Sequence, residues 1–408
     1  MLFSIPAEAE EIISVLEYNG HEAYLVGGCV RDYLMDITPY DFDICTSALP
    51  EEISSLFART VHTGIRHGTV TVLKNHGSFE VTTFRVESGY SDHRHPDNVR
   101  FSSSLIMDLQ RRDFTVNAMA YHPEKGLIDP FGGADDIKEK LIRSVGNPDE
   151  RFGEDSLRML RAIRFQAKSG FTVEQKTLRA IHVLAKAIKY VSHERILAEM
   201  NGILCGGFPE AILNLFATGL VRYILPVPVF LQPDVSPFFH LEQKPSVRWA
   251  AFFKQTGIIC LPEIKNTCDY LKMSNSLKRD ILLTSGVLKG HFPDTPFRIR
   301  ITLSSLGLDI FSDSLKILRA TGFEPDAIEN IEVMLEKIIR EKHCTHPSTL
   351  TVKGGDLISE GIPPGRILGD ILDVLFLCVL QNPLLNRRDI LIKIAEEINA
   401  KYQIGYHA

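Results

Sequence analysis

The sequence has no long hydrophobic run, few cysteines and no excess of positive charge, and each absence excludes a class of protein. No stretch of about 18 uncharged apolar residues occurs, so we expect no membrane-spanning helix and no membrane partner. The start, MLFSIPAEAEEII, lacks the basic segment of a secretory signal. The seven cysteines include no CxxC pair, which argues against a disulfide framework or a zinc site. Together these absences predict a cytoplasmic protein.

What is present is the composition of an ordinary globular protein. The 408 residues are 44 % apolar and 24 % charged, which excludes collagen and wholesale disorder and suggests two to four domains. The net charge of −6 does not favour a nucleic-acid partner on composition alone.

The pattern of the chain changes near residue 150. Before it, helix-like and strand-like segments alternate, with strands expected at 23–28, 41–46, 69–73 and 79–84 and helices at 7–18 and 30–35. After it, helical spacing dominates, at 154–168, 174–190, 193–205, 209–216, 314–320, 326–340 and 366–381. The sequence therefore predicts an α+β protein, with a head that holds a small sheet and a mostly α-helical remainder.

The strongest local constellation is LVGGCVRD followed by YDFDICT. Asp41 and Asp43 alternate along an expected strand, so both side chains should point to the same face, where their repulsion favours a divalent cation such as Mg²⁺. Gly27 and Gly28 stand between a strand and a helix, where backbone N–H groups can approach an anion, and Arg31 follows within reach of a phosphate. This combination predicts phosphoryl or nucleotidyl transfer. The alternative is a tight turn beside a solvated strand end.

A second constellation, GEDSLRMLRAIRF, predicts a cationic helix. Arg158, Arg161 and Arg164 recur every three residues, and Asp155 precedes Arg158 by the same interval, so these two side chains should be neighbours. A carboxylate acceptor beside a guanidinium donor matches cytosine and adenine and mismatches uracil and guanine, at roughly 1–3 kcal/mol for each unpaired group. The alternative is a surface Asp–Arg pair.

These residues resemble the class II tRNA nucleotidyltransferase and poly(A) polymerase family, with its polymerase-β-like head. Further similar blocks follow in the family's order: RRDFTVNAMAY, DPFGGADDIKEKLIRSVGNPDERFGEDSLRMLRAIRF, SHERILAE and the C-terminal TVKGGDLI and PPGRILGDIL. Length and tail look most like the CCA-adding enzymes of Firmicutes-type bacteria.

The resemblance implies a role for each matching residue. It assigns Asp41 and Asp43 to catalysis and metal binding, and the remaining nucleotide contacts to Gly27, Gly28, Arg31, Arg112, Asp113, Asn117, Asp155, Arg158, Arg161 and Arg164. In this set Asp113 and Asn117 lie near the sugar, and the EDxxR segment acts as an amino-acid template for the base. Glu80 is the candidate for a third acidic residue, with an exposed strand position as the alternative.

The function implied is CCA addition to the tRNA 3′ end from CTP and ATP, with Mg²⁺ as cofactor and pyrophosphate released. Partners are then tRNA, ATP and CTP, and the chain is a monomer or homodimer. The implied domains are a catalytic head (1–125), a nucleotide-recognising neck (126–200), a helical body (201–340) and a tRNA-binding tail (341–408). Three alternatives stay open: an enzyme adding only the final A, a poly(A) polymerase, and a catalytically inactive RNA-binding protein.

One segment bears on the first alternative. Residues 84–101 resemble the family's flexible loop, whose presence favours a chain able to add A, although His95 stands where the family commonly has an arginine.

Overall fold

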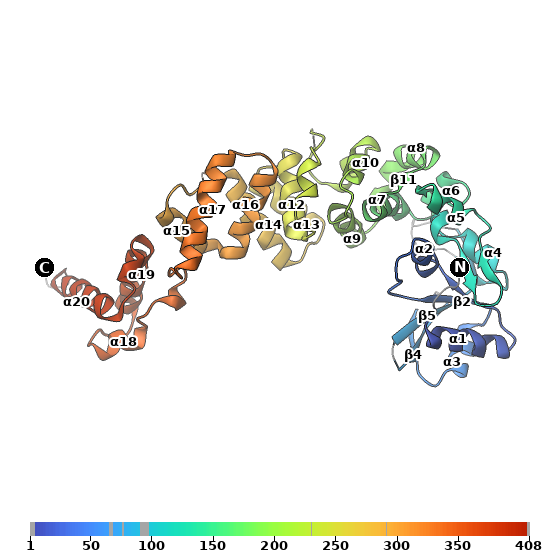
Figure 1. Cartoon of the computed structure of the whole chain (residues 1–408), viewed down its shortest axis with the longest axis horizontal. Helices are drawn as coiled ribbons and strands as arrows, with labels where there is room; N and C mark the ends of the chain where they lie inside the picture. Colours follow the sequence, from blue (N-terminus) through green and yellow to red (C-terminus); the bar gives the residue numbers. More distant parts are fainter. Residues whose placement is uncertain are drawn as a thin grey trace. The chain divides into compact units, whose positions relative to one another are not determined.

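The computed structural model describes residues 5–64, 68–75, 77–89, 98–229, 231–290 and 292–405. The chain divides into two compact units, Met1–Val235 with Asn266–Met273, and Ser236–Lys265 with Ser274–Ala408 (Figure 1). No helix within the described ranges is long and apolar enough to cross a membrane.

The first unit opens with a seven-stranded mixed sheet, in the order β3-β4-β5-β2-β1-β8-β9. Its strands are β1 (Ala23–Val26), β2 (Asp43–Thr46), β3 (Thr60–Gly64), β4 (Thr69–Lys74), β5 (Gly77–Thr83), β8 (Ala120–His122) and β9 (Gly126–Ile128). The central β2 pairs antiparallel with β1 and parallel with β5. This confirms the predicted α+β head. The last two strands have three residues each, too few for alternation to reveal.

Helices complete the first unit. Those of the head are α1 (Ala7–Tyr18), α2 (Gly28–Leu34), α3 (Pro50–Leu56), α4 (Leu105–Gln110), η2 (Thr115–Asn117) and α5 (Gly133–Lys138). Then follow α6 (Pro148–Glu154), α7 (Leu157–Ser169), α8 (Gln175–Leu184), η3 (Ala185–Tyr190), α9 (His193–Leu204), α10 (Ala211–Ala217) and α11 (Val221–Ile224). Two short two-stranded pairs, β10 (Leu141–Ile142) with β11 (Thr172–Val173) and β6 (Arg85–Ser88) with β7 (Asn98–Phe101), lie outside the main sheet.

The predicted helix at 154–168 is instead two helices. α6 ends at Glu154 and α7 begins at Leu157, while Asp155 has extended backbone angles, φ −134° and ψ 103°. The Asp155 carboxylate accepts a hydrogen bond from the Leu157 N–H at 3.1 Å. Aspartate competes in this way with helical hydrogen bonding, so it starts α7 rather than continuing α6.

The predicted flexible loop lies only partly in the described structure. Its two ends pair as antiparallel strands, with Arg85 opposite Phe101 and Ser88 opposite Asn98. His95 is outside the described residues.

The second unit is helical throughout its described part. It contains η4 (Ser236–Phe239), α12 (Pro245–Gln255), the start of α13 (Leu261–Tyr270), α14 (Asn275–Lys289), α15 (Pro296–Leu306), α16 (Leu308–Ala320), α17 (Pro325–Arg340), η5 (Pro347–Thr349), α18 (Gly354–Ser359), α19 (Arg366–Gln381), η6 (Pro383–Leu385) and α20 (Arg388–Gly405).

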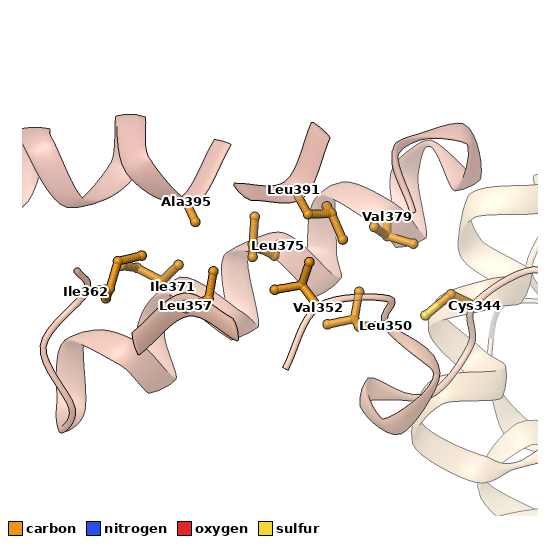
Figure 2. Packing of buried hydrophobic residues seen from close by; sticks show 10 residues of the cluster. All are labelled: Cys344, Leu350, Val352, Leu357, Ile362, Ile371, Leu375, Val379, Leu391 and Ala395. Carbon is orange, nitrogen blue, oxygen red and sulfur yellow. The ribbon is translucent and has the colours of Figure 1, made fainter. Parts of the chain in front are cut away.

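Its last three helices share a core of their own. Leu357 of α18, Leu375 of α19 and Leu391 of α20 are fully buried against one another (Figure 2). Apolar residues on α19 repeat at helical spacing from Ile371 to Val379, and this face turns toward α18 and α20.

Candidate active site

A polar cleft of about 400 Å³ in the first unit collects most of the predicted site residues. Its lining includes Gly27, Gly28, Arg31, Asp43, Arg112, Asp113, Asn117, Asp155, Arg158 and Arg161, which were predicted, and Arg111, Phe165 and Arg195, which were not. These come from segments more than 150 residues apart along the chain. Asp41, Glu80 and Arg164 do not contribute to this lining.

The acidic edge of the site lies at the start of β2. Asp43 is the first residue of that strand and pairs with Val26 of β1, whereas Asp41 precedes the strand. Ile44 pairs with Val81 in the parallel β2–β5 ladder, so Asp43 and Glu80, one residue earlier on each strand, share a face of the sheet.

The pKa of Asp43 reports this crowding. Partial desolvation raises the pKa of its carboxyl, the negative charges of Glu80 and Asp41 add to the rise, and Arg112 opposes it. A cation between these carboxylates would relieve their repulsion. Among the residues that the structure describes, no three His, Cys, Asp or Glu side chains gather closely enough to hold a metal ion by themselves.

The Gly27–Gly28 turn brings backbone close to two arginines. Gly27 has φ 76° and ψ −126°, which an L side chain rarely adopts, and a Cβ there would lie 3.1 Å from Arg112 Nη1. Arg112 donates from Nη2 to Asp108 at 3.2 Å, and its buried Nε has no hydrogen-bond partner among the described atoms. Arg112 therefore keeps donor capacity beside the turn.

A chain of hydrogen bonds joins four of the residues that line the cleft. Arg31 Nη1 donates to Asn117 Oδ1 at 2.6 Å, and Asn117 Nδ2 donates to Asp113 Oδ1 at 3.1 Å. Arg161 donates to Asp113 Oδ2 from Nη2 at 2.6 Å and from Nε at 2.8 Å. Burial alone would raise the pKa of Asp113, but Arg161 and Asn117 lower it to about 2, so this carboxylate is charged.

The structure corrects the expected Asp155–Arg158 pairing. Asp155 Oδ2 instead accepts from Arg195 Nη2 of α9 at 2.7 Å, and Arg158 Nη1 donates to Glu154 Oε2 at 2.7 Å. Both Asp155 and Arg158 still line the cleft. The helix break at Asp155 is the reason, because it takes this side chain off the face that carries Arg158.

Arg164 links α7 to α9 and does not line the cleft. Its Nε donates to Glu199 Oε2 of α9 at 2.5 Å, and its side chain lies where a Cβ on Gly202 would fall. Arg195 and Glu199 are four residues apart on α9 and hold Asp155 and Arg164 respectively. Their opposite charges at helical spacing were the signal in SHERILAE that could have revealed them.

Family models match this chain in three consecutive regions. Residues 23–143 match a poly(A) polymerase head domain, residues 170–230 an RNA and SrmB-binding site of polymerase A, and residues 239–395 a tRNA nucleotidyltransferase domain 2.

Similar proteins extend over nearly the whole chain. Proteins named CCA-adding enzyme from Leuconostoc mesenteroides and Limosilactobacillus reuteri are each 37 % identical to it, over 96 % of either sequence. The crystal structure of the Bacillus stearothermophilus CCA-adding enzyme in complex with CTP is 31 % identical and covers 98 % of both chains, with a TM-score of 0.79. A Thermotoga maritima CCA-adding enzyme complexed with tRNA shares the fold at 20 % identity, with a TM-score of 0.65 over 97 % of this chain and 96 % of that one.

Proposed function

The chain belongs to the tRNA nucleotidyltransferase and poly(A) polymerase family, among its CCA-adding enzymes, and from this we propose how its residues act. It adds CCA to the 3′ end of tRNA from CTP and ATP, without a nucleic-acid template, and releases pyrophosphate. The observation that carries this assignment is one cleft lined by the Asp43 carboxylate at the start of β2, by several arginines and by Asp155 with Arg158.

We propose Mg²⁺ as the divalent ion, held by Asp41 and Asp43. The donor set fits, because Mg²⁺ is usually bound by one or two carboxylates together with substrate phosphates rather than by an all-protein cage. The raised pKa of Asp43 supports this, since Glu80 and Asp41 crowd it with negative charge. When bound, the ion neutralises triphosphate charge and lowers the pKa of the attacking 3′-hydroxyl. Glu80 adds negative charge at the same edge.

The triphosphate would lie along the Gly27–Gly28 turn, beside Arg31 and Arg112. Because glycine has no side chain, the backbone N–H groups of this turn can approach the phosphates. Arg31 Nε and Nη2 are held by Asp32, which fixes the guanidinium for a second contact. Asp113 and Asn117 complete the floor, where we place the ribose.

The incoming base would be read by Asp155 and Arg158, each fixed by a partner of its own. Arg158 uses both Nη1 hydrogens on Arg151 O and Glu154 and one Nη2 hydrogen on Arg111 O, which leaves one Nη2 hydrogen and Nε–H as donors. The Asp155 oxygens accept from Leu157 and Arg195 and retain lone pairs. An acceptor and a donor thus remain for the amino group and ring nitrogen of C or A.

The alternatives differ in product rather than in chemistry. The relatives that extend over 96 % of this chain are named CCA-adding enzymes, which does not favour an A-only enzyme or a poly(A) polymerase. We infer a cytoplasmic location, because all seven cysteines are free thiols, as a reducing compartment keeps them.

The product itself tests the function. Three tRNA transcripts, ending at the discriminator base, at C and at CC, are incubated with enzyme, Mg²⁺ and CTP, ATP or both, and resolved on a gel. We expect the first transcript to gain CCA and then stop. Extension of the CC-ending transcript alone, by one A, would make this an A-adding enzyme, a long A ladder would make it a poly(A) polymerase, and no extension would leave an RNA-binding protein.

A further inference from the structure

Three guanidinium groups from two helices surround the ring of Phe165 on α7. The Cζ atoms of Arg31, Arg161 and Arg164 lie 5.3, 5.7 and 4.7 Å from the ring centroid. All three distances are within the roughly 6 Å over which an aromatic quadrupole attracts a cation. Arg31 comes from α2, so the ring joins the phosphate side of the cleft to α7.

Each of these arginines has a carboxylate partner of its own. Arg31 pairs with Asp32 at 2.6 Å, Arg161 with Asp113 at 2.6 Å and Arg164 with Glu199 at 2.5 Å. The carboxylates balance the charges but come from three separate segments: α2, the connection between α4 and η2, and α9. The Phe165 ring is the contact that all three guanidinium groups have in common.

The ring itself is held rigidly on one side. Phe165 is 9 % exposed and packs edge to face on the fully buried Phe114, with centroids 5.6 Å apart and planes at 80°. Such a pair fixes the ring plane. The guanidinium groups can therefore take their positions from the ring.

Behind the ring lies space into which an arginine could move. Phe165 and Arg31 line both the polar cleft and a second cavity of about 250 Å³, whose other lining residues include Val116, Phe171 and Phe208. Arg31 is also hydrogen-bonded to Asp32 and Asn117. When the attraction of the ring is lost, we expect these bonds alone to hold its guanidinium less firmly against a move toward the second cavity. The loss would then appear in nucleotide binding.

We propose that Phe165 is a positioning residue for nucleotide binding: its ring holds the guanidinium groups of Arg31 and Arg161 at the separation that CTP and ATP require. The inference rests on the proposed function, because it assigns these arginines to the nucleotide. What it requires at position 165 is an aromatic ring, not merely apolar volume.

The test compares Phe165→Leu with Phe165→Tyr. The leucine keeps an apolar side chain without a quadrupole, and the tyrosine keeps the ring. We expect Phe165→Leu to raise the KM for CTP and ATP about tenfold, equivalent to about 1.4 kcal/mol at 25 °C, with kcat lowered less than about threefold and the KM for tRNA unchanged. For Phe165→Tyr, we expect a KM for CTP and ATP within about threefold of the wild-type value. Calorimetric titration with CTP in the absence of tRNA should show the same ranking of Kd.

Phe238→Leu is the matched control. Phe238 is fully buried and has the Arg248 guanidinium 5.6 Å from its ring centroid, but it lies in the second unit. It should lower the Tm without changing the KM for nucleotides. If the leucine at 165 does not fold, Phe165→Met gives a second apolar variant.

Two results would overturn the role of the ring: an unchanged KM and Kd in Phe165→Leu, or equal defects in the leucine and tyrosine variants. Failure of the proposed function is a separate result, because wild-type enzyme would then not extend tRNA, while the CTP titration would still report on Phe165.

Discussion

At the scale of single residues, the acidic edge of the cleft combines function with a cost in stability. Asp43 lies exposed at the start of β2, but partial desolvation of its carboxyl and the nearby charges of Glu80 and Asp41 raise its pKa in the folded protein. The folded state then binds this proton more tightly than the unfolded chain, whose carboxyl has the ordinary value near 3.8. Its contribution to the free energy of unfolding therefore falls as the pH rises through the window between those two pKa values.

Asp43→Asn should accordingly separate stability from activity. Without metal, we expect the variant to have a higher Tm than wild type at pH 7, and the difference should shrink as the pH is lowered toward 4. Nucleotidyl transfer should fall more than about 100-fold for both CTP and ATP, since even outer-shell partners of a metal cost about 10–100-fold. Thermal scans at several pH values and primer extension measure the two effects.

The control for this variant is Asp135→Asn. Asp135 lies in an exposed pair with Lys138, with side chains 77 % and 75 % exposed, so neither Tm nor transfer should change appreciably. Filter binding should show that Asp43→Asn still binds tRNA. Loss of tRNA binding would contradict a metal-binding role for Asp43.

At the scale of elements, the positions of the two residues that we propose to read the base depend on how three helices meet. Asp155 sits between α6 and α7, and its carboxylate is held by Arg195 from the first turn of α9. Arg158 is held by Glu154 at the end of α6. The distance between acceptor and donor is therefore set by the packing of α9 and α6 around α7, not by a contact between Asp155 and Arg158.

Arg195→Ala should therefore impair base choice although Arg195 was not predicted to read the base. We expect Asp155→Ala and Arg195→Ala each to reduce the preference for CTP over UTP about tenfold or more, because an unpaired polar group costs roughly 1–3 kcal/mol. The measurement is the ratio of kcat/KM for the two nucleotides on a tRNA that ends at the discriminator base.

Glu194→Ala is the neighbouring control on the same helix. Glu194 forms an exposed ion pair with Lys272, with side chains 55 % and 57 % exposed, so its removal should leave the ratio unchanged. An Arg195→Ala variant that loses Tm but keeps full discrimination against UTP would show that Arg195 only supports packing.

At the scale of the whole molecule, the seven cysteines are free thiols distributed over both units. Cys29, Cys45, Cys268 and Cys344 are buried, whereas Cys260 is exposed. Burial raises the pKa of the Cys29 thiol to about 11 and also raises that of Cys45, so both stay protonated and unreactive near the active cleft.

In a thiol titration, we expect the rate at which each cysteine reacts to follow its exposure to solvent. In native protein at pH 8 we expect Cys260 to react first with a disulfide reagent, the intermediate Cys205 and Cys378 more slowly, and the four buried thiols only after denaturation, for seven in total. Dithiothreitol should leave the Tm unchanged. Fewer than seven thiols in freshly purified, denatured protein would instead indicate a disulfide.

The sequence by itself determined what depends on near neighbours along the chain. The Gly27–Gly28 turn and the arginines of α7 follow from residue type and period, because turn and helix geometry sets these positions locally. The predicted strand at 41–46 was wrong at its start, because β2 begins at Asp43 and Asp41 precedes it. The helical spacing at 366–381 likewise predicted α19, which extends from Arg366 to Gln381.

Only the tertiary structure decided which distant groups meet. Glu80 joins Asp43 through the β2–β5 ladder, Asp155 pairs with Arg195 rather than with Arg158, and Arg31 meets Arg161 and Arg164 on Phe165. These contacts bring together segments dozens of residues apart, and no local period encodes them. The Asp155–Arg195 ion pair arises because a charged group that is largely removed from water needs a partner on the element that packs against it.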